Sequence, residues 1–158
     1  MHRRTVAAAV CAVALVALAV PTVSAGPPDR GSWSGEGDDV DATTCGFAVT
    51  IHWAVAGDYT VFYDRTATSM TMWIEQDVEQ DTFTANGRTL IGLPYRFTGK
   101  TVLDPDGDIV SMVASGVLQA VPLPDGSVYR SAGHYDFLTD EHTGLTGDTE
   151  SFCAALAP

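Results

Sequence analysis

The chain has 158 residues and a formal net charge of −12, from 20 acidic and 8 basic side chains. This acidity excludes nucleic acid and anionic membrane surfaces as favoured partners, because both carry negative charge. The length fits one domain once an N-terminal segment is set apart.

Residues 1–25 have the pattern of a secretory signal peptide. Arg3 and Arg4 precede a 15-residue apolar run over 6–20, and small residues follow up to Ala25. We predict cleavage after Ala25 and a secreted, extracellular protein. The apolar run is shorter than the roughly 20 residues of a spanning helix, so we expect no membrane anchor. Cleavage would leave six basic against twenty acidic side chains, a net charge of −14.

Residues 26–44 are predicted to form a flexible polar leader. They are rich in Gly, Ser and Asp, and Trp33 is their single large apolar side chain. Such a segment buries too little apolar surface to offset the entropy of ordering the chain. The folded β-domain is therefore expected to span 45–158.

Two cysteines lie in this domain, Cys45 and Cys153. In a secreted protein an even pair is most simply one disulfide, which here would join the start of the domain to its end. No CxxC pattern accompanies them, and this argues against a structural zinc site.

Apolar and polar residues alternate with period two from Phe47 onward, which is typical of strands with one face in water. The alternation predicts strands over 47–55, 70–78, 93–104, 110–120 and 129–137. We expect an all-β fold, an antiparallel meander of about seven to eight strands that forms a curled barrel or a sandwich.

Glycines mark the expected turns and bends. Asn-Gly or Asp-Gly pairs at 86–87, 106–107 and 125–126 predict hairpin turns at regular spacing. Gly116 and Gly133 lie at similar distances from the third of these turns, so we expect them to face each other on neighbouring strands. Paired glycine bends are one way for a sheet to curl over on itself.

The stretch DPDGDIV at 104–110 has the carboxylates of a calcium loop, Asp104, Asp106 and Asp108. An EF-hand loop places its glycine sixth and ends on a glutamate at the twelfth position. Here the glycine is fourth and the twelfth residue is Ser115. We therefore predict a hairpin tip and leave open weak calcium binding by the three carboxylates.

The alternation ends after Leu138, and a polar loop follows. The segment DTESFCAALA at 148–157 predicts a short C-terminal helix, capped by Asp148 or Thr149, that carries Cys153.

The order of signal peptide, polar leader, CGF at 45–47, PDGSVYRSAGH at 124–134 and FCAALA at 152–157 resembles a group of uncharacterised small secreted β-rich proteins of high-GC Gram-positive bacteria. The resemblance implies secretion, a β-rich fold and the bridge between the two cysteines, and it implies no activity. GSW at 31–33 has a weaker likeness to the motif that opens lipocalin barrels.

A catalytic alternative, a hydrolase or isomerase, would use the polar faces of two predicted strands. Arg130, His134 and Asp136 share one such face, and Arg96 and Lys100 share the other. Inside a barrel these groups would suit acid–base chemistry. The opposite faces carry the aromatic residues, so we expect the polar groups to face water. With no G-x-S-x-G motif either, the sequence favours a non-catalytic protein.

Neither a metal nor a cofactor is expected. The spacing of His52, His134 and His142 matches no helical or hairpin ligand pattern. No glycine-rich loop precedes a helix to hold a phosphate.

The leading hypothesis is an extracellular binding or interaction protein, expected to be a monomer with an unknown partner. Its candidate contact residue is Trp73, on a face of its strand that is predicted to be wet and acidic. The other members of that face are Glu75, Asp77, Glu79 and Asp81.

The alternative is a carrier of a small apolar ligand with a lipocalin-like barrel. Its candidate ligand-binding residues are the soft and aromatic side chains on the faces inferred to point inward. These are Met70, Met72, Tyr95, Phe97 and Met112.

Overall fold

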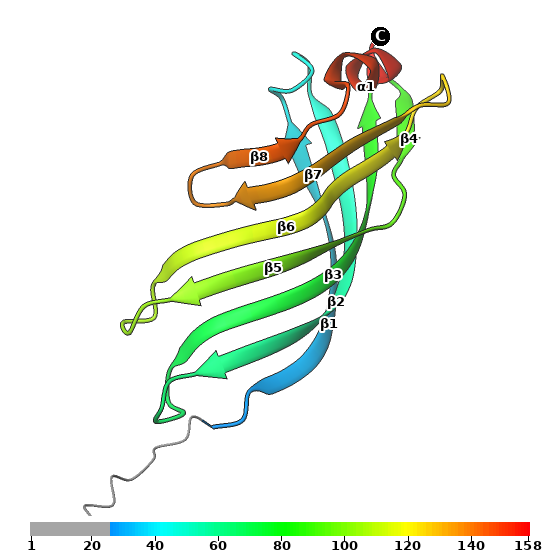
Figure 1. The fold of residues 1–158 in the computed structure, drawn as a ribbon. Helices are drawn as coiled ribbons and strands as arrows, with labels where there is room; N and C mark the ends of the chain where they lie inside the picture. Colours follow the sequence, from blue (N-terminus) through cyan, green and yellow to red (C-terminus); the bar gives the residue numbers. More distant parts are fainter. Residues whose placement is uncertain (1–25) are drawn as a thin grey trace, which may run out of the picture.

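The computed structural model describes residues 26–158 (Figure 1). The predicted signal peptide over 1–25 lies outside the described residues. Eight strands form one antiparallel sheet, and a single helix follows near the C-terminus. The elements are β1 Asp29–Asp41, β2 Val49–Tyr63, β3 Met70–Ala85, β4 Arg88–Ile91, β5 Tyr95–Leu103, β6 Ile109–Pro122, β7 Val128–Asp136, β8 Glu141–Leu145 and α1 Thr149–Leu156.

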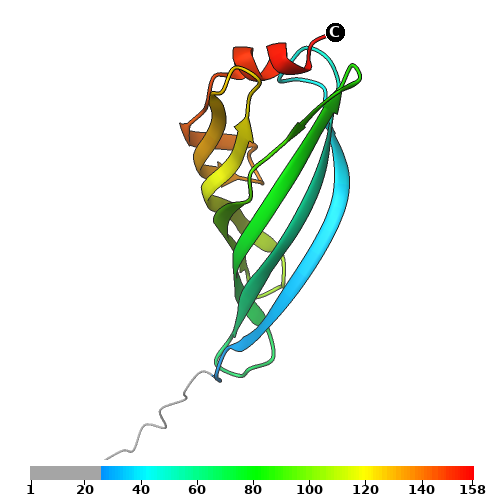
Figure 2. The same ribbon diagram turned by 90° about the vertical axis from the view of Figure 1, so that its right-hand side faces the viewer.

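The strands follow the order β1-β2-β3-β5-β6-β7-β8, and β4 pairs with the C-terminal part of β3. This arrangement confirms the predicted antiparallel meander. The sheet curls so that β1–β3 lie opposite β6–β8, with α1 over one end of the space between them (Figure 2). It does not close, because β1 and β8 remain as edges. The molecule is therefore an open, curled sheet.

The prediction of a flexible leader over 26–44 is wrong, because most of that segment is the 13-residue edge strand β1. Gly31 pairs with Tyr59 and Gly37 pairs with Trp53 across the β1–β2 ladder. A Cβ atom at either glycine would lie 2.5 Å from the partner's ring, so the ring occupies the place of the missing side chain. Aromatic side chains that cover glycines in this way stabilise an edge strand. The folded sheet thus begins at Asp29, ahead of Cys45.

A row of three glycines crosses the sheet where it bends. Gly116 faces Gly133, as predicted, and Gly133 in turn faces Gly144. Their φ angles are +135°, +140° and +140°, a region that favours glycine. The register of β6 and β7 also shifts between Val117 and Gln119, one step beyond the row.

The main core lies beneath α1. Phe152 of the helix packs edge-on against Phe83, with ring centroids 5.2 Å apart, and against Tyr129 at 4.9 Å. The predicted disulfide between Cys45 and Cys153 is present. The buried residues of this core are Val49, Phe83, Ala85, Leu90, Val121, Leu123, Tyr129, Phe152 and Leu156.

Two local predictions are confirmed. The helix is capped by Asp148, whose side chain accepts a hydrogen bond from Ser151 N at 3.2 Å. The DPDGDIV stretch is a hairpin tip in which Asp104 Oδ1 accepts hydrogen bonds from Asp106 N at 2.9 Å and Asp108 N at 3.0 Å. The carboxylate of Asp104 is therefore engaged within its own turn.

Candidate functional site

The two faces of β3 are reversed relative to the sequence prediction. Residues that pair directly across a ladder point to the same face of the sheet. Asp77 and Asp81 lie on the same face as Val55 and Phe83, which are buried. The two aspartates are only 2% and 3% exposed. The predicted wet, acidic face around Trp73 is therefore part of the inner face, and that prediction is wrong.

A hollow of about 650 Å³ lies where the sheet fails to close. One wall comes from the end of β1 and the start of β2, and the other comes from β6, β7 and the turn before β8. Its apolar floor consists of Val49, Ile51, Phe83 and Phe152. The remaining lining residues are Val40, Asp41, Thr43, Thr44, Gln119, Tyr129, Tyr135 and Asp140.

A buried carboxyl cluster lies on the inner face just beyond this floor. The Tyr95 hydroxyl is 2.7 Å from Glu79 Oε1 and 2.9 Å from Asp81 Oδ2. A hydroxyl has one proton, so both contacts can be hydrogen bonds only if one carboxyl group is protonated. Burial, reinforced by the charge of Glu79, raises the pKa of Asp81 to about 7. The cluster therefore holds a proton in mildly acidic solution.

Asp77 extends the carboxyl row toward the opposite end of the sheet. Its Oδ1 accepts a hydrogen bond from Trp33 Nε1 at 3.2 Å. Its neighbour on β2 is Gly57, where a Cβ atom would overlap Asp77 Oδ1, so glycine leaves the space that the carboxylate fills. Burial raises the pKa of Asp77, and burial with the nearby Asp77 charge raises the pKa of Glu75 to about 7. The inner face of β3 is thus a row of four carboxyl groups.

The polar rim of the hollow carries two further carboxylates. Burial alone would raise the pKa of Asp41, but hydrogen bonds from Thr44 and Thr43 lower it to about 2. On the facing wall, Asp140 Oδ1 accepts a hydrogen bond from the Tyr135 hydroxyl. The rim is therefore negative at neutral pH on the side formed by the end of β1.

The predicted ligand residues do not come together. Tyr95 and Phe97 lie on the inner face, with ring centroids 6.2 Å apart, and Met112 shares that face at its exposed end. Met72 lies on the outer face, because it belongs to the opposite set of alternating positions on β3. Met70 lies beyond a register shift, opposite Tyr63 at the start of β3. None of the five lines the hollow.

Trp73 is half-buried against Tyr59, with ring centroids 5.7 Å apart. Its indole nitrogen is buried without a hydrogen-bond partner in the described part of the chain. The side chain therefore packs within the sheet, and the exposed contact face predicted for it does not exist.

The polar groups considered for catalysis stay on the outer face. Arg130, His134, Arg96 and Lys100 are exposed, as the sequence predicted. Asp136 is half-buried, and its carboxylate accepts a hydrogen bond from Leu138 N in the following turn. The inward-facing acid–base set on which the hydrolase or isomerase alternative depended is therefore not formed.

The histidines each have a local environment. His52 Nδ1 lies 3.0 Å from Asp38 Oδ1, and His134 Nδ1 lies 3.0 Å from Ser115 Oγ on the adjacent strand. His142 lies on β8, 3.3 Å from Thr146 Oγ1. Among residues 26–158 no group of three or more His, Cys, Asp or Glu side chains is arranged to hold a metal ion.

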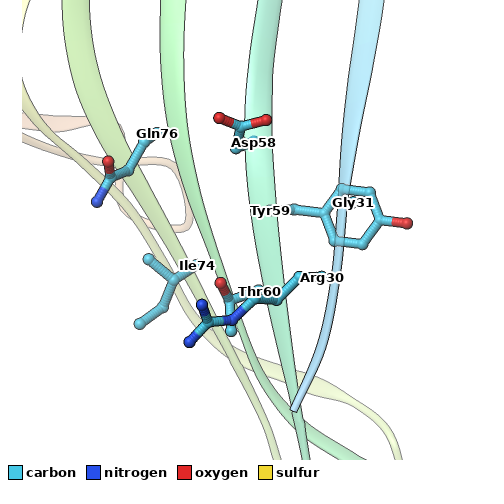
Figure 3. A pocket seen from close by; sticks show the side chains of 7 residues that line it. All are labelled: Arg30, Gly31, Asp58, Tyr59, Thr60, Ile74 and Gln76. Carbon is cyan, nitrogen blue, oxygen red and sulfur yellow. The ribbon is translucent and has the colours of Figure 1, made fainter.

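A second hollow, of about 570 Å³, is an open groove on the outer face of β1–β3 (Figure 3). Arg30 and Asp58 give it one charge of each sign, and Ile74 is its aliphatic lining residue. It lacks the floor of buried aromatic rings that distinguishes the first hollow.

Comparison with protein-family models, with curated proteins and with solved structures found no match to this chain. Within residues 26–158 no helix has the length and apolar character needed to cross a membrane.

Sequence reasoning missed the hollow because its walls come from segments far apart in the chain. The predicted leader contains three of the lining residues, Asp41, Thr43 and Thr44, and the predicted helix contains Phe152. The one usable signal was the alternation that placed Tyr129 and Tyr135 on the apolar face of their strand. That pattern indicates burial but does not indicate which residues lie opposite.

Proposed function

We propose that this protein is a binding protein that holds a small amphiphilic molecule in the hollow between its two sheet edges. The observation that carries the proposal is the hollow itself, with its apolar floor and polar rim. Its volume of about 650 Å³ lies within the range of small-molecule sites, roughly 300–1,000 Å³. Ile51 is partly exposed at the floor, and Val49, Phe83 and Phe152 reach it with 2–5% of their surface, so the floor suits a small apolar group and the rim suits a polar head.

The surroundings of the hollow favour a preformed site. Phe83 and Phe152 of its floor are packed against each other in the main core. The disulfide joins Cys45, which follows the Thr43–Thr44 wall, to Cys153, which follows Phe152. The wall that contains Thr43 and Thr44 is thus covalently linked to the helix that carries Phe152 of the floor, and little ordering is needed when a ligand binds. Disulfides also persist in oxidising compartments, which supports our proposal that the protein acts outside the cytosol.

The experiment is titration with N-phenyl-1-naphthylamine, an uncharged apolar probe that fluoresces more strongly in an apolar environment. Gln119→Trp places a large ring in the hollow, and Gln76→Trp makes the same change in the outer groove. We expect the wild type and Gln76→Trp to bind the probe equally, and Gln119→Trp to lose binding. Circular dichroism controls for the fold. If Gln76→Trp alone abolishes binding, or if the folded wild type does not bind, the proposal is wrong.

A further inference from the structure

All the charges that line the hollow are negative. Twelve residues line it, and the charged ones are Asp41 and Asp140. The pKa of Asp41, lowered to about 2 by the hydrogen bonds of its turn, keeps that carboxylate ionised in neutral solution. A ligand head at the rim therefore meets negative charge, with no lysine or arginine among the lining residues.

The inner face beyond the floor carries the row of four carboxyl groups, which is partly protonated near neutral pH because burial raises the pKa of Glu75, Asp77 and Asp81. Ile51 and Phe83 of the floor are paired, and the next pair on the same face is Trp53 with Asp81. Further along β3 lie the other three carboxyl groups of the row. All six Lys and Arg side chains of residues 26–158 are exposed. Carboxylates between low-dielectric walls focus their field into the space that the walls enclose.

The walls of the hollow also suit a cation through their rings. Phe83, Tyr129, Tyr135 and Phe152 contribute aromatic side chains to the lining, and Tyr135 is the one of the four that is not buried. The face of an aromatic ring attracts a cation, and a quaternary ammonium group is the form most often recognised in this way. Ile51 and Tyr135 are the partly exposed apolar side chains of the lining that a short hydrocarbon tail can contact, and Val49, Phe83, Tyr129 and Phe152 lie behind them with 2–7% of their surface exposed.

We propose that the molecule held in the hollow is an organic ammonium ion with an apolar tail. This inference rests on the proposed binding function of the hollow and specifies the class of its ligand. The tail lies on the floor formed by Val49, Ile51, Phe83 and Phe152, and the ammonium head lies at the rim between Asp41 and Asp140. A ligand with an anionic head is repelled by the same two carboxylates.

The test compares three compounds that share one tail and differ in head charge: octyltrimethylammonium, 1-octanol and octyl sulfate. Each is titrated below its micelle concentration against the wild-type protein loaded with the naphthylamine probe. Because the tail contributes equally, the difference reports the head. We expect the cation to displace the probe at a concentration at least about tenfold lower than the alcohol, given the size of a charge interaction near a protein surface. Octyl sulfate should be the weakest, and added salt should reduce the cation's advantage.

Asp140→Asn identifies the carboxylate. Asp140 has a φ of +58°, which asparagine tolerates well. The amide oxygen of asparagine can still accept the hydrogen bond from the Tyr135 hydroxyl. The variant should keep the fold, lose several-fold in cation affinity and leave octanol affinity unchanged. Asp106→Asn, at an exposed hairpin tip, makes the same change in net charge and should alter neither.

The outcomes separate the two proposals. If the alcohol and the cation displace the probe equally well, the hollow is a binding site but the ligand class is wrong. If the probe and all three compounds fail to bind the folded protein, both proposals are wrong. If Asp106→Asn weakens cation binding as much as Asp140→Asn does, the effect comes from net charge, and the assignment of the ammonium head to the rim is overturned.

Discussion

The indole N–H of Trp33 donates a hydrogen bond to Asp77 Oδ1 at 3.2 Å, across the intervening strand β2. Gly57 lies between the two residues in the sheet, opposite Trp33 on one side and opposite Asp77 on the other. The only large apolar side chain of the predicted leader therefore reaches over a glycine to a buried carboxyl group. This hydrogen bond stabilises the position of the edge strand β1 against the interior of the sheet.

Trp33→Phe should destabilise the protein by about 1–3 kcal/mol, because it keeps a ring but leaves a buried carboxyl oxygen without its donor. Urea unfolding measures the effect. The matched control is Trp53→Phe, which also removes an indole from the inner face but leaves the bond to Asp77 intact. Equal losses in the two variants would show that ring area, and not the hydrogen bond, determines the effect.

Stability should fall as the pH rises from about 4.5 to above 7. The pKa of Glu75 is raised from 4.5 to about 7, and that of Asp81 from 3.8 to about 7, in each case chiefly by burial. In this window the folded protein keeps protons that the unfolded chain has lost. The contribution of these groups is therefore complete below their unfolded pKa values and is lost as the pH passes through 7.

Glu75→Gln tests this dependence, since it removes the ionisation and keeps the shape. Relative to the wild type, it should be more stable at pH 8 by on the order of 1 to 2 kcal/mol, after allowance for partial solvent contact, and little changed at pH 4. Glu36→Gln, on the exposed face of β1, is the control. A wild type with equal urea midpoints at pH 4 and pH 8 would contradict the prediction.

Gly133→Ala should be strongly destabilising, by more than about 2 kcal/mol, because its φ is +140° and a Cβ atom would overlap Thr143 O. Gly35→Ala is the matched strand control: its Cβ atom would lie 3.5 Å from the Trp33 ring, an ordinary contact. We expect Gly35→Ala to change the urea midpoint little. Similar losses in both variants would mean that the positive φ of Gly133 and its close approach to Thr143 O do not determine the loss.

Most of the features that the sequence predicted are local ones, and the disulfide is the exception. Turns need glycine at a few fixed positions, and a helix cap needs one side chain, so the hairpin at 104–108 and the cap at Asp148 follow from short motifs. The pairing of Gly116 with Gly133 follows from counting outward from a turn. The disulfide follows from there being two cysteines in the folded part.

The features that escaped prediction depend on which strands become neighbours. On β3 both alternating sets contain large apolar residues, and Ile74 and Val78 favour the set that turns out to face outward. The acidic set is buried instead because Tyr95 and Trp33 bring hydrogen-bond donors to it from other strands. Neither partner is visible from the sequence of β3 alone.

Removing the disulfide with Cys45→Ala and Cys153→Ala should cost about 4 to 5 kcal/mol in the chain-entropy model, since the bond closes a loop with a sequence separation of 108. Urea unfolding of the double variant, and of the reduced wild type, measures the loss. The variant should also bind the naphthylamine probe more weakly, because the wall at Thr43 and Thr44 is no longer linked to the helix that carries Phe152. Unchanged stability would show that the unfolded chain is already compact around this contact.

The most direct test of the central claim is an NMR measurement of intermolecular nuclear Overhauser effects between bound octyltrimethylammonium and the protein. Occupation of the hollow predicts contacts from the octyl chain to the ring protons of Phe83 and Phe152, and from the N-methyl groups to residues beside Asp140. Contacts to Tyr59 and Ile74 of the outer groove, with none to the two phenylalanines, would contradict the claim.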